Sequence, residues 1–518
     1  MENMTEDLAN TWQVLDGRKG DLVARCEQYA MWTIPSVCPT DNEDGAEQSK
    51  GNVAIGARLV NHLSNRIVDT MFPSDKPFFT LPLTAEAQKR LTEDLGEDEM
   101  NAFASQIREA TSTAENAAMR KLNLTAYRPI AVQAVQHQIV TGNAIIHRTE
   151  DDMRTVYGIK DFCCTRDVKG NLLTVILKDS KLFASLPKEL QEKLKETRED
   201  YKSDTPVVLY TYYYKENGKW SRIQGVDTYV IQSTKKSYKD ADFPVLALTW
   251  NLSRGESYGR GLVEDHAVTF NNVDVTTLAM IDLIGFAADL KFLVEPSSQL
   301  DIDEWNRAAR GSYNPGRKDD ISVPDFPKRI EIQIMMEAVS KWERELAQSF
   351  LLNSAGVRDA ERVTAEEIRF YARELESAYG GLYSRLALEW QQKEAEYLIS
   401  KIDFSVVSET GIETFDVMVT TGLESLSREG QLDNLRLAVG DLQMLDAVPE
   451  DLRAVINKRK FAEFVFTNRG VKLAEFVYTE EEMQAQQQAA QQEQQAMMNA
   501  QTEQAVAQEA GKSAVRSS

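Results

Sequence analysis

Cysteine is scarce in this chain of 518 residues, which has four: Cys26, Cys38, Cys163 and Cys164. Four are too few for a disulfide scaffold, and no C-x-x-C pair is present to indicate a zinc site. Long apolar runs are also missing, since no stretch of about eighteen uncharged apolar residues occurs. The sequence therefore predicts no helix that spans a bilayer. The acidic opening MENMTEDLAN lacks an apolar core and predicts no signal peptide, so we expect folding in a cytoplasm.

Positive charge is outnumbered, with 59 Lys and Arg against 81 Asp and Glu and a net charge of −22. Affinity for DNA comes largely from neutralised phosphates, so a protein that grips DNA usually presents a basic face. The acidity disfavours an ordinary DNA-binding role but fits a channel through which DNA slides without sticking. Apolar residues at 42% and charged residues at 27% are typical of a globular protein, and the length indicates two to four domains.

Catalytic motifs are absent as well. Gly511-Lys512-Ser513 matches the last three positions of the phosphate-binding motif G-x-x-x-x-G-K-[ST]. Val506 stands where that motif begins with glycine. Gly255–Gly261 has the wrong spacing for a dinucleotide site and is typical of a turn. The four histidines lie in no zinc-protease or nucleophile-elbow motif, and Asp301 and Asp303 are expected to be solvated. The sequence predicts no catalytic residue, no metal and no cofactor.

The first part of the chain predicts helices and then strands. Ile55, Leu59, Leu63 and Ile67 recur every fourth residue and form one apolar stripe. From Gly142 to Trp250 the pattern changes to strands. The predicted helices are 8–29, 53–71, 96–122, 126–140 and 186–198, with a short strand at 78–81 and hairpins around 167–171 and 216–218.

The second part is mostly helical. One helix is predicted from Gly261 to Val294, roughly 48 Å long, and another from Glu331 to Leu352, antiparallel to the first. Thr364–Glu367 has a capping-box pattern that starts a helix to Ile402, with a kink at Gly380-Gly381. The remaining predictions are strands at 404–407 and 415–419, helices from 428, and a polar Gln-rich tail at 484–510 that is either helical or disordered.

One polar stripe marks the helix after Gly261. Asn271, Asp274, Asp282 and Asp289 fall within an arc of roughly 80°, and the other positions are largely apolar. So much apolar surface needs neighbours on two or more sides, which a ring of identical copies would provide. The stripe then faces the remaining open side, which is either a lumen or an ordinary outer surface.

Several stretches resemble the portal proteins of short-tailed bacteriophages, in that family's order along nearly the whole chain. The most specific are Leu352–Ala355 and Glu361–Arg369. The others are Tyr29–Ser36, Gly56–Pro73, Val140–Asn143, Gly255–Arg260 and Thr421–Glu424.

The resemblance implies an α+β, mostly helical portal fold. Its expected regions are the wing at 1–259 (helices, then antiparallel strands), stem helix 1 at 260–294, the clip at 295–330, stem helix 2 at 331–352, the tunnel loop at 353–363, a long kinked helix with returning wing strands at 364–427, and the crown with the Gln-rich tail at 428–518.

The resemblance also implies a function that is not enzymatic. About twelve copies form a ring at the capsid vertex, through which double-stranded DNA is packaged and ejected and on which the tail assembles. Its implied partners are the packaging motor (large terminase) at the clip, a tail adaptor, and the capsid and scaffolding proteins. The ring belongs to the virion and is assembled in the host bacterial cytoplasm.

The residues add a hypothesis about the channel. The acidic stem residues would repel phosphates and centre the duplex, while Arg358 and Arg362 in the tunnel loop would contact it. For these two arginines, surface or inter-subunit salt bridges are the competing interpretation. An internal virion or scaffold protein without a channel is the alternative function, and a metal-dependent nucleic-acid enzyme is a less favoured one.

Overall fold

The computed structural model describes most of the first four hundred residues. The described ranges are 7–40, 51–73, 77–82, 97–186, 188–197, 202–216, 218–226, 229–288, 293–297, 301–307, 329–352 and 381–401, with single residues or short pieces at 84, 309, 313, 317, 321–322, 374, 377–379 and 417–419. The chain divides into two compact units, Met1–Leu423 and Glu424–Ser518. Every described residue belongs to the first unit.

The chain begins with two helices where the sequence predicted one. Helix α1 (Leu8–Gly17) is capped by the Asp7 carboxylate, which accepts from the Asn10 amide, and helix α2 (Gly20–Trp32) follows. The break lies at Lys19, whose buried ammonium donates to the carbonyls of Ile159 and Phe162, both at 2.6 Å. These distant acceptors hold the chain at the point where the single helix was expected to continue.

The following helices agree with the sequence. The apolar stripe that the four-residue repeat predicted is present on α3, where Leu59, Leu63 and Ile67 are buried, and α3 packs on α6. Helices α5 and α6 are separated at Ala126, which has a left-handed backbone with φ 48°. The bounds are α3 Gly56–Met71, α5 Glu97–Leu124 and α6 Tyr127–Thr141, with a short 3₁₀ turn η2 at Pro35–Val37.

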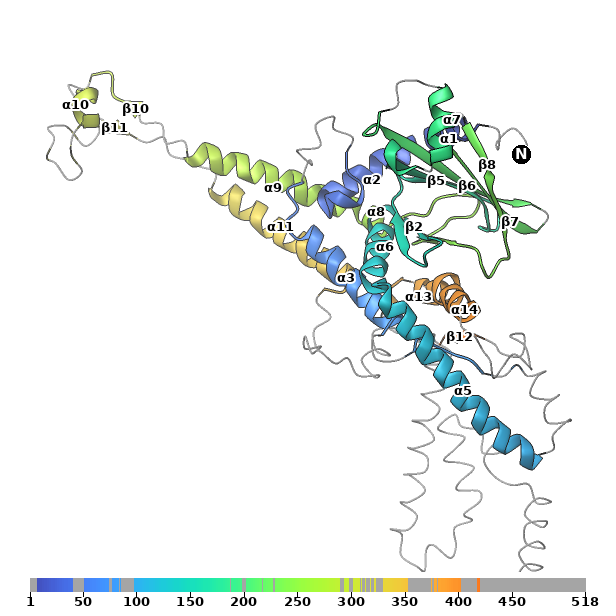
Figure 1. Cartoon of the computed structure of the whole chain (residues 1–518). Helices are drawn as coiled ribbons and strands as arrows, with labels where there is room; N and C mark the ends of the chain where they lie inside the picture. The colour runs from blue at the N-terminus through green and yellow to red at the C-terminus, as the bar shows by residue number, and fades with distance from the viewer. Residues whose placement is uncertain are drawn as a thin grey trace, which may run out of the picture. The chain divides into compact units, whose positions relative to one another are not determined.

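Between Asn143 and Thr249, antiparallel strands form a five-stranded and a three-stranded sheet (Figure 1). The five-stranded sheet has the order β4-β5-β6-β7-β8, and the three-stranded sheet has the order β3-β2-β9. Both predicted hairpin turns are present, with glycines of positive φ at Gly170 and Gly218. The bounds are β2 Asn143–Arg148, β3 Arg154–Tyr157, β4 Phe162–Arg166, β5 Leu172–Leu182, β6 Pro206–Glu216, β7 Lys219–Val226, β8 Tyr229–Tyr238 and β9 Val245–Thr249, with η3 at Phe183–Ser185 and α7 at Lys188–Thr197.

The core lies on both faces of the larger sheet. Because side chains alternate along a strand, Tyr212 and Tyr214 of β6 join Trp12 of α1 in one apolar cluster. Tyr213 points the other way, and its hydroxyl lies 2.8 Å from His147 Nε2 on β2. The two sheets thus meet through their side chains, and the chain is an α+β protein, as predicted.

A pair of long helices follows the sheets. The predicted continuous helix from Gly261 to Val294 is wrong in two places. It is interrupted at His266, between α8 (Leu262–Asp265) and α9 (Ala267–Ala288), and Leu293–Val294 is the short strand β10. Strand β10 pairs with β11 (Ile321–Ser322), and α10 (Ile302–Arg307) lies between them in the chain.

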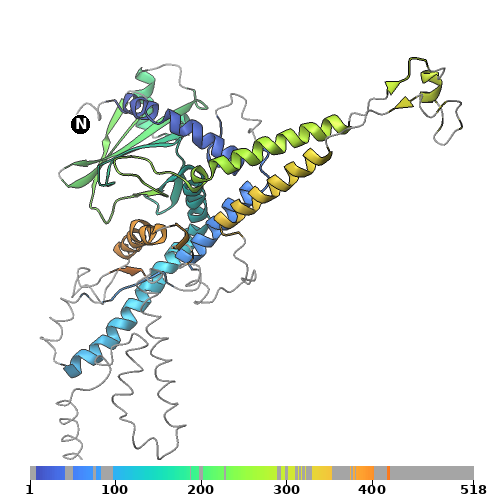
Figure 2. The same ribbon diagram turned by 180° about the vertical axis from the view of Figure 1, so that it is seen from behind.

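Helix α11 (Arg329–Ser349) returns beside α9, as both views show (Figures 1 and 2). The ring of Phe350, just after α11, meets Phe270 near the start of α9 edge to face, with centroids 5.9 Å apart. The end of one helix therefore contacts the beginning of the other, which confirms the predicted antiparallel pair. We call α8, α9 and α11 together the stem.

The last described helices pack back on the α+β region. They are α13 (Leu382–Leu386), a π-helical turn η4 (Ala387–Gln392) and α14 (Lys393–Ser400). Gly381 has φ 87° directly before α13, so the backbone leaves helical geometry at Gly381, where the sequence predicted a kink. Strand β12 (Met418–Val419) pairs with β1 (Phe79–Thr80), inside the strand predicted at 415–419. The capping box at 364–367, the strand at 404–407 and the region from 428 lie outside the described residues.

Candidate functional site

Helix α9 of the stem carries apolar residues on nearly every side. Phe270 and Val273 of α9 are buried, and Leu346 and Phe350 are buried at the end of α11. The ring of Phe270 also stacks on Trp32 of α2, with the ring planes 4° apart. These contacts hold the base of the stem against the rest of the unit.

Beyond its base the stem exposes large apolar side chains. Val268 is 75% exposed and Ile281 51%. The exposed set is Val268, Val275, Leu278, Ile281 and Ile284 on α9, and Ile334 and Met336 on α11. Several large apolar side chains left exposed on one pair of helices are consistent with surfaces that another protein covers.

The predicted acidic stripe divides into two groups. Asn271 and Asp282 are both exposed and lie roughly 20° apart around α9. The helical repeat would extend their line to Asp289, which lies outside the described residues, as do Arg358 and Arg362. Apolar Val275 and Leu278 flank this line closely, so the polar surface is narrow.

Asp274 lies about 60° from that line and has a different environment. Its Oδ1 accepts from the Asn52 backbone amide at 2.5 Å, and its Oδ2 accepts from Trp32 Nε1 at 3.2 Å. The Asn52 side-chain amide also donates to it at 3.2 Å. The carboxylate of Asp274 is therefore directed at its own chain, whereas the sequence had placed it on an open face.

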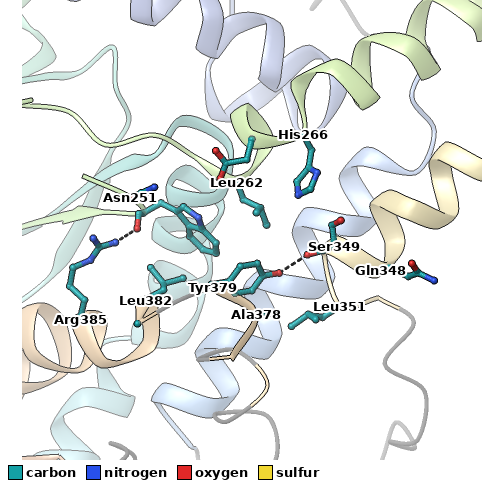
Figure 3. Close-up of a pocket in the computed structure, with 13 residues that line it drawn as sticks. Asn251, Leu262, His266, Gln348, Ser349, Leu351, Ala378, Tyr379, Leu382 and Arg385 are labelled. Atoms are coloured by element: carbon teal, nitrogen blue, oxygen red, sulfur yellow. Dashed lines mark hydrogen bonds between the residues drawn. The ribbon is translucent and has the colours of Figure 1, made fainter. Parts of the chain in front are cut away.

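A cleft of about 520 Å³ lies at the base of the stem (Figure 3). Tyr379 Oη donates to the Ser349 carbonyl at 2.8 Å, and the Arg385 guanidinium donates to the carbonyls of Thr249 and Trp250. Burial lowers the pKa of His266 and raises that of Tyr379, so both are neutral at pH 7. None of these groups forms a nucleophile-and-base pair, and the cleft carries no argument for catalysis.

A buried ion network joins α14 to the three-stranded sheet. Glu394 Oε2 accepts from Arg148 Nη2 at 2.8 Å, and its Oε1 accepts from Arg154 Nη2 at 2.6 Å. All three side chains are almost completely buried. Burial alone would raise the pKa of Glu394, but the two guanidiniums outweigh it and hold that pKa below its ordinary value. The network is structural, since its charges are satisfied by one another.

Two classes of site are not found in the part of the chain that the structure describes. No group of three or more His, Cys, Asp or Glu side chains there is placed to hold a metal ion. No helix among the described residues is both long enough and apolar enough to cross a membrane. The stem remains as the candidate functional surface.

Known proteins are similar to this chain over most of its length. A family model described as bacteriophage head to tail connecting protein matches residues 5–404. The chain is 28% identical to the portal protein of Enterobacteria phage SP6, over 94% of this chain and 93% of that protein. It is 26% identical to the portal protein of Escherichia phage T7, over 93% of this chain and 90% of that protein. A chain in the solved virion of a native gene transfer agent particle matches with 11% identity, over 74% of this chain and 85% of that chain. Its TM-score of 0.34 is too low to support a fold assignment.

Proposed function

Because the chain belongs to the family of bacteriophage head to tail connecting proteins, we propose that it is the portal subunit whose ring forms the DNA channel at the capsid vertex. The phage genome is packaged and ejected through this channel, and the tail assembles on it. The role is structural, and no enzymatic step is assigned to the chain. One observation within the molecule carries the proposal beyond family membership: the exposed apolar side chains on both stem helices.

That surface supports the proposed ring. Burying apolar area stabilises an association by roughly 25 cal/mol per Å², and a head-to-tail contact between unlike faces closes into a ring when its rotation permits. Exposed Ile281 and Ile284 on α9 and Ile334 on α11 supply such faces on both helices of one stem. In our proposal the stems of about twelve copies pack side by side around the channel axis.

The regions of the chain then take the following roles. The wing is 1–259 with the returning strands of 364–427, the stem is 260–294 with 331–352, the clip is 295–330, the tunnel loop is 353–363 and the crown is 428–518. The clip contacts the packaging motor and later the tail adaptor, and the outer parts of the ring meet the capsid and scaffolding proteins. The ring belongs to the virion after assembly in the host cytoplasm.

The channel wall works by weak, nonspecific electrostatics. Asn271, Asp282 and Asp289 face the lumen, where carboxylates repel the phosphates and keep the duplex from adhering. Arg358 and Arg362 contact the phosphates at the constriction, where guanidiniums bind and release them as DNA moves. Asp274 has no part in this wall, because Trp32 and Asn52 occupy its carboxylate.

A charge placed on the stem tests the ring. In Ile281→Asp, closing the interface would bury a carboxylate without a partner, which is strongly unfavourable. We expect this variant to remain folded by circular dichroism and to fail to form closed rings in negative-stain electron microscopy. Val168→Asp is the matched control, since Val168 is also exposed but lies on the β4–β5 turn. Rings that form equally well in both variants would contradict the proposed stem interface.

The scaffold alternative makes a different prediction. An internal virion or scaffold protein without a channel needs no closed ring, so Ile281→Asp would leave its native assembly unchanged. A nucleic-acid enzyme would require a carboxylate cluster for its metal, and the described residues hold no group of that kind.

A further inference from the structure

The root of the stem is joined to the α+β region through glycines that tolerate no side chain. Gly142 ends α6 with φ 77°, and a Cβ atom there would lie 2.5 Å from backbone atoms of Gly259 and Arg260. A Cβ atom on Gly261 would lie 2.6 Å from the Ile139 carbonyl oxygen. The chain before β2 and the chain before α8 are thus in direct backbone contact.

Asn143 closes this joint. It is 2% exposed, and its Nδ2 donates to the carbonyls of Thr141 and Gly259, both at 2.8 Å. Its Oδ1 accepts from the Gly259 amide at 2.7 Å. One side chain therefore ties both segments together, and α8 is fixed to the sheets.

The joint alone does not fix the rest of the stem. The helix is interrupted at His266, where the backbone leaves helical geometry with φ −109° and ψ 15°. A break of this kind is a point about which α9 can bend relative to α8. Beyond His266 the Phe270 ring packs against Trp32 and Phe350, and a polar attachment in the same stretch gives α9 one direction.

Asp274 supplies that attachment, about two turns or roughly 12 Å beyond His266. Its carboxylate accepts from Trp32 Nε1, the Asn52 amide and the Asn52 side chain, as described above. The segment that carries Asn52 is itself fixed to α2, because the Gly51 amide donates to the Met31 carbonyl at 3.0 Å. The Trp32 ring also stacks on Phe270, one turn before Asp274.

We infer that Asp274 is a positioning residue, which latches α9 to α2 and with the Asn143 joint sets the direction of the stem. The latch lies within one chain and stands whether or not a ring forms. Its consequence for the channel, namely that it sets the tilt of the wall helices, rests on the proposed function.

Two variants separate the latch from general destabilisation. Asp274→Ala removes all three acceptor contacts, and Trp32→Phe keeps an aromatic ring against Phe270 while it removes one donor. Asp282→Ala is the control, because Asp282 is an exposed carboxylate on the same helix.

Hydrogen exchange reports the latch directly. A hydrogen bond to a charged acceptor is strong enough that its loss speeds exchange of the freed amide by about tenfold or more. We expect that increase at the Asn52 amide in Asp274→Ala, with no change in Asp282→Ala. In Trp32→Phe, where the Asn52 acceptor remains, we expect a smaller increase. Unchanged exchange at Asn52 in Asp274→Ala would overturn the latch.

Spin labels report the direction of α9. All four native cysteines are buried, so Ala279→Cys on α9 and Lys235→Cys on β8 can be labelled selectively in a chain diluted with unlabelled protein. We expect one narrow distance distribution in this background and in Asp282→Ala, and a broadened, shifted one in Asp274→Ala and Trp32→Phe. A distribution in Trp32→Phe as narrow as that in Asp282→Ala would refute the inference, and this comparison holds even if Asp274→Ala fails to fold. Ring closure, scored separately by microscopy, tests the proposed function.

Discussion

Replacing Glu394 by Gln isolates the buried ion network, since it keeps the shape of the side chain and removes its charge. Arg148 and Arg154 lie directly opposite each other on β2 and β3. Like charges in that position repel, and the single carboxylate of Glu394, which pairs with both guanidiniums, offsets this repulsion. The Gln amide nitrogen would also present a donor to one guanidinium, which has only donors.

The size of the effect follows from burial. Each of the three side chains is at most 2% exposed, and breaking a buried ion pair by removing one partner destabilises by about 3–5 kcal/mol. Because the unfolding entropy is about 2.1 cal/mol/K per residue, a unit that spans Met1–Leu423 shifts by only about 1 °C per kcal/mol, and its melting temperature should fall by about 3–6 °C.

Thermal unfolding of the full chain by circular dichroism measures this loss. Glu396→Gln is the control, because Glu396 lies on the same helix, is half-buried and accepts from the neutral Gln392 side chain at 3.0 Å. The Glu394 pKa is lowered in the folded state, so its stabilisation is present above the ordinary pKa of about 4.3 and is lost as the pH falls through the folded value. The Gln variant should lack that acid-side loss. Equal melting temperatures for the two variants would refute this account of the network.

Three further substitutions test the packing that positions the stem and the sheets. Lys19→Met leaves the Ile159 and Phe162 carbonyls without their donor and should cost about 2 kcal/mol in denaturant unfolding, whereas exposed Lys181→Met should cost little. Gly142→Ala should cost roughly 2–4 kcal/mol, because positive φ and backbone overlap both oppose it. Gly218→Ala has a similar φ but open space around it, and should cost only about 1 kcal/mol. Burial lowers the pKa of His147 to about 4, so the unfolded chain takes up its proton first and stability should fall as the pH drops from about 6.5 toward 4. His147→Phe should reduce the loss of unfolding free energy between pH 6.5 and 4. An unchanged pH dependence of this free energy would contradict the lowered pKa of His147.

Local signals in the sequence were sufficient for many elements. The stripe of α3 and the glycine turns at Gly170 and Gly218 depend on residues close together in the chain, and the structure has them as predicted. The break at Lys19 could not be predicted in this way. Its cause is a pair of carbonyl acceptors on a strand region far along the chain, which no local pattern contains.

The stem shows the same difference between features set by nearby residues and features set by distant ones. Helical periodicity states which residues share a face, and it correctly grouped Asn271 with Asp282. It does not state which neighbour covers a face, so the contact of Asp274 with Trp32 was not foreseen. The two motifs around Gly142 and Gly259 were both recognised in the sequence, but only the fold brings them into backbone contact through Asn143.

Cryo-electron microscopy of the purified full chain tests the central claim most directly. The account predicts a closed ring in which the exposed apolar faces of α9 and α11 meet the adjacent copies, around an axial opening wide enough for a DNA duplex, with Asn271 and Asp282 lining that opening. A ring without such an opening, or a closed dimer that buries the stem faces against each other, would contradict it.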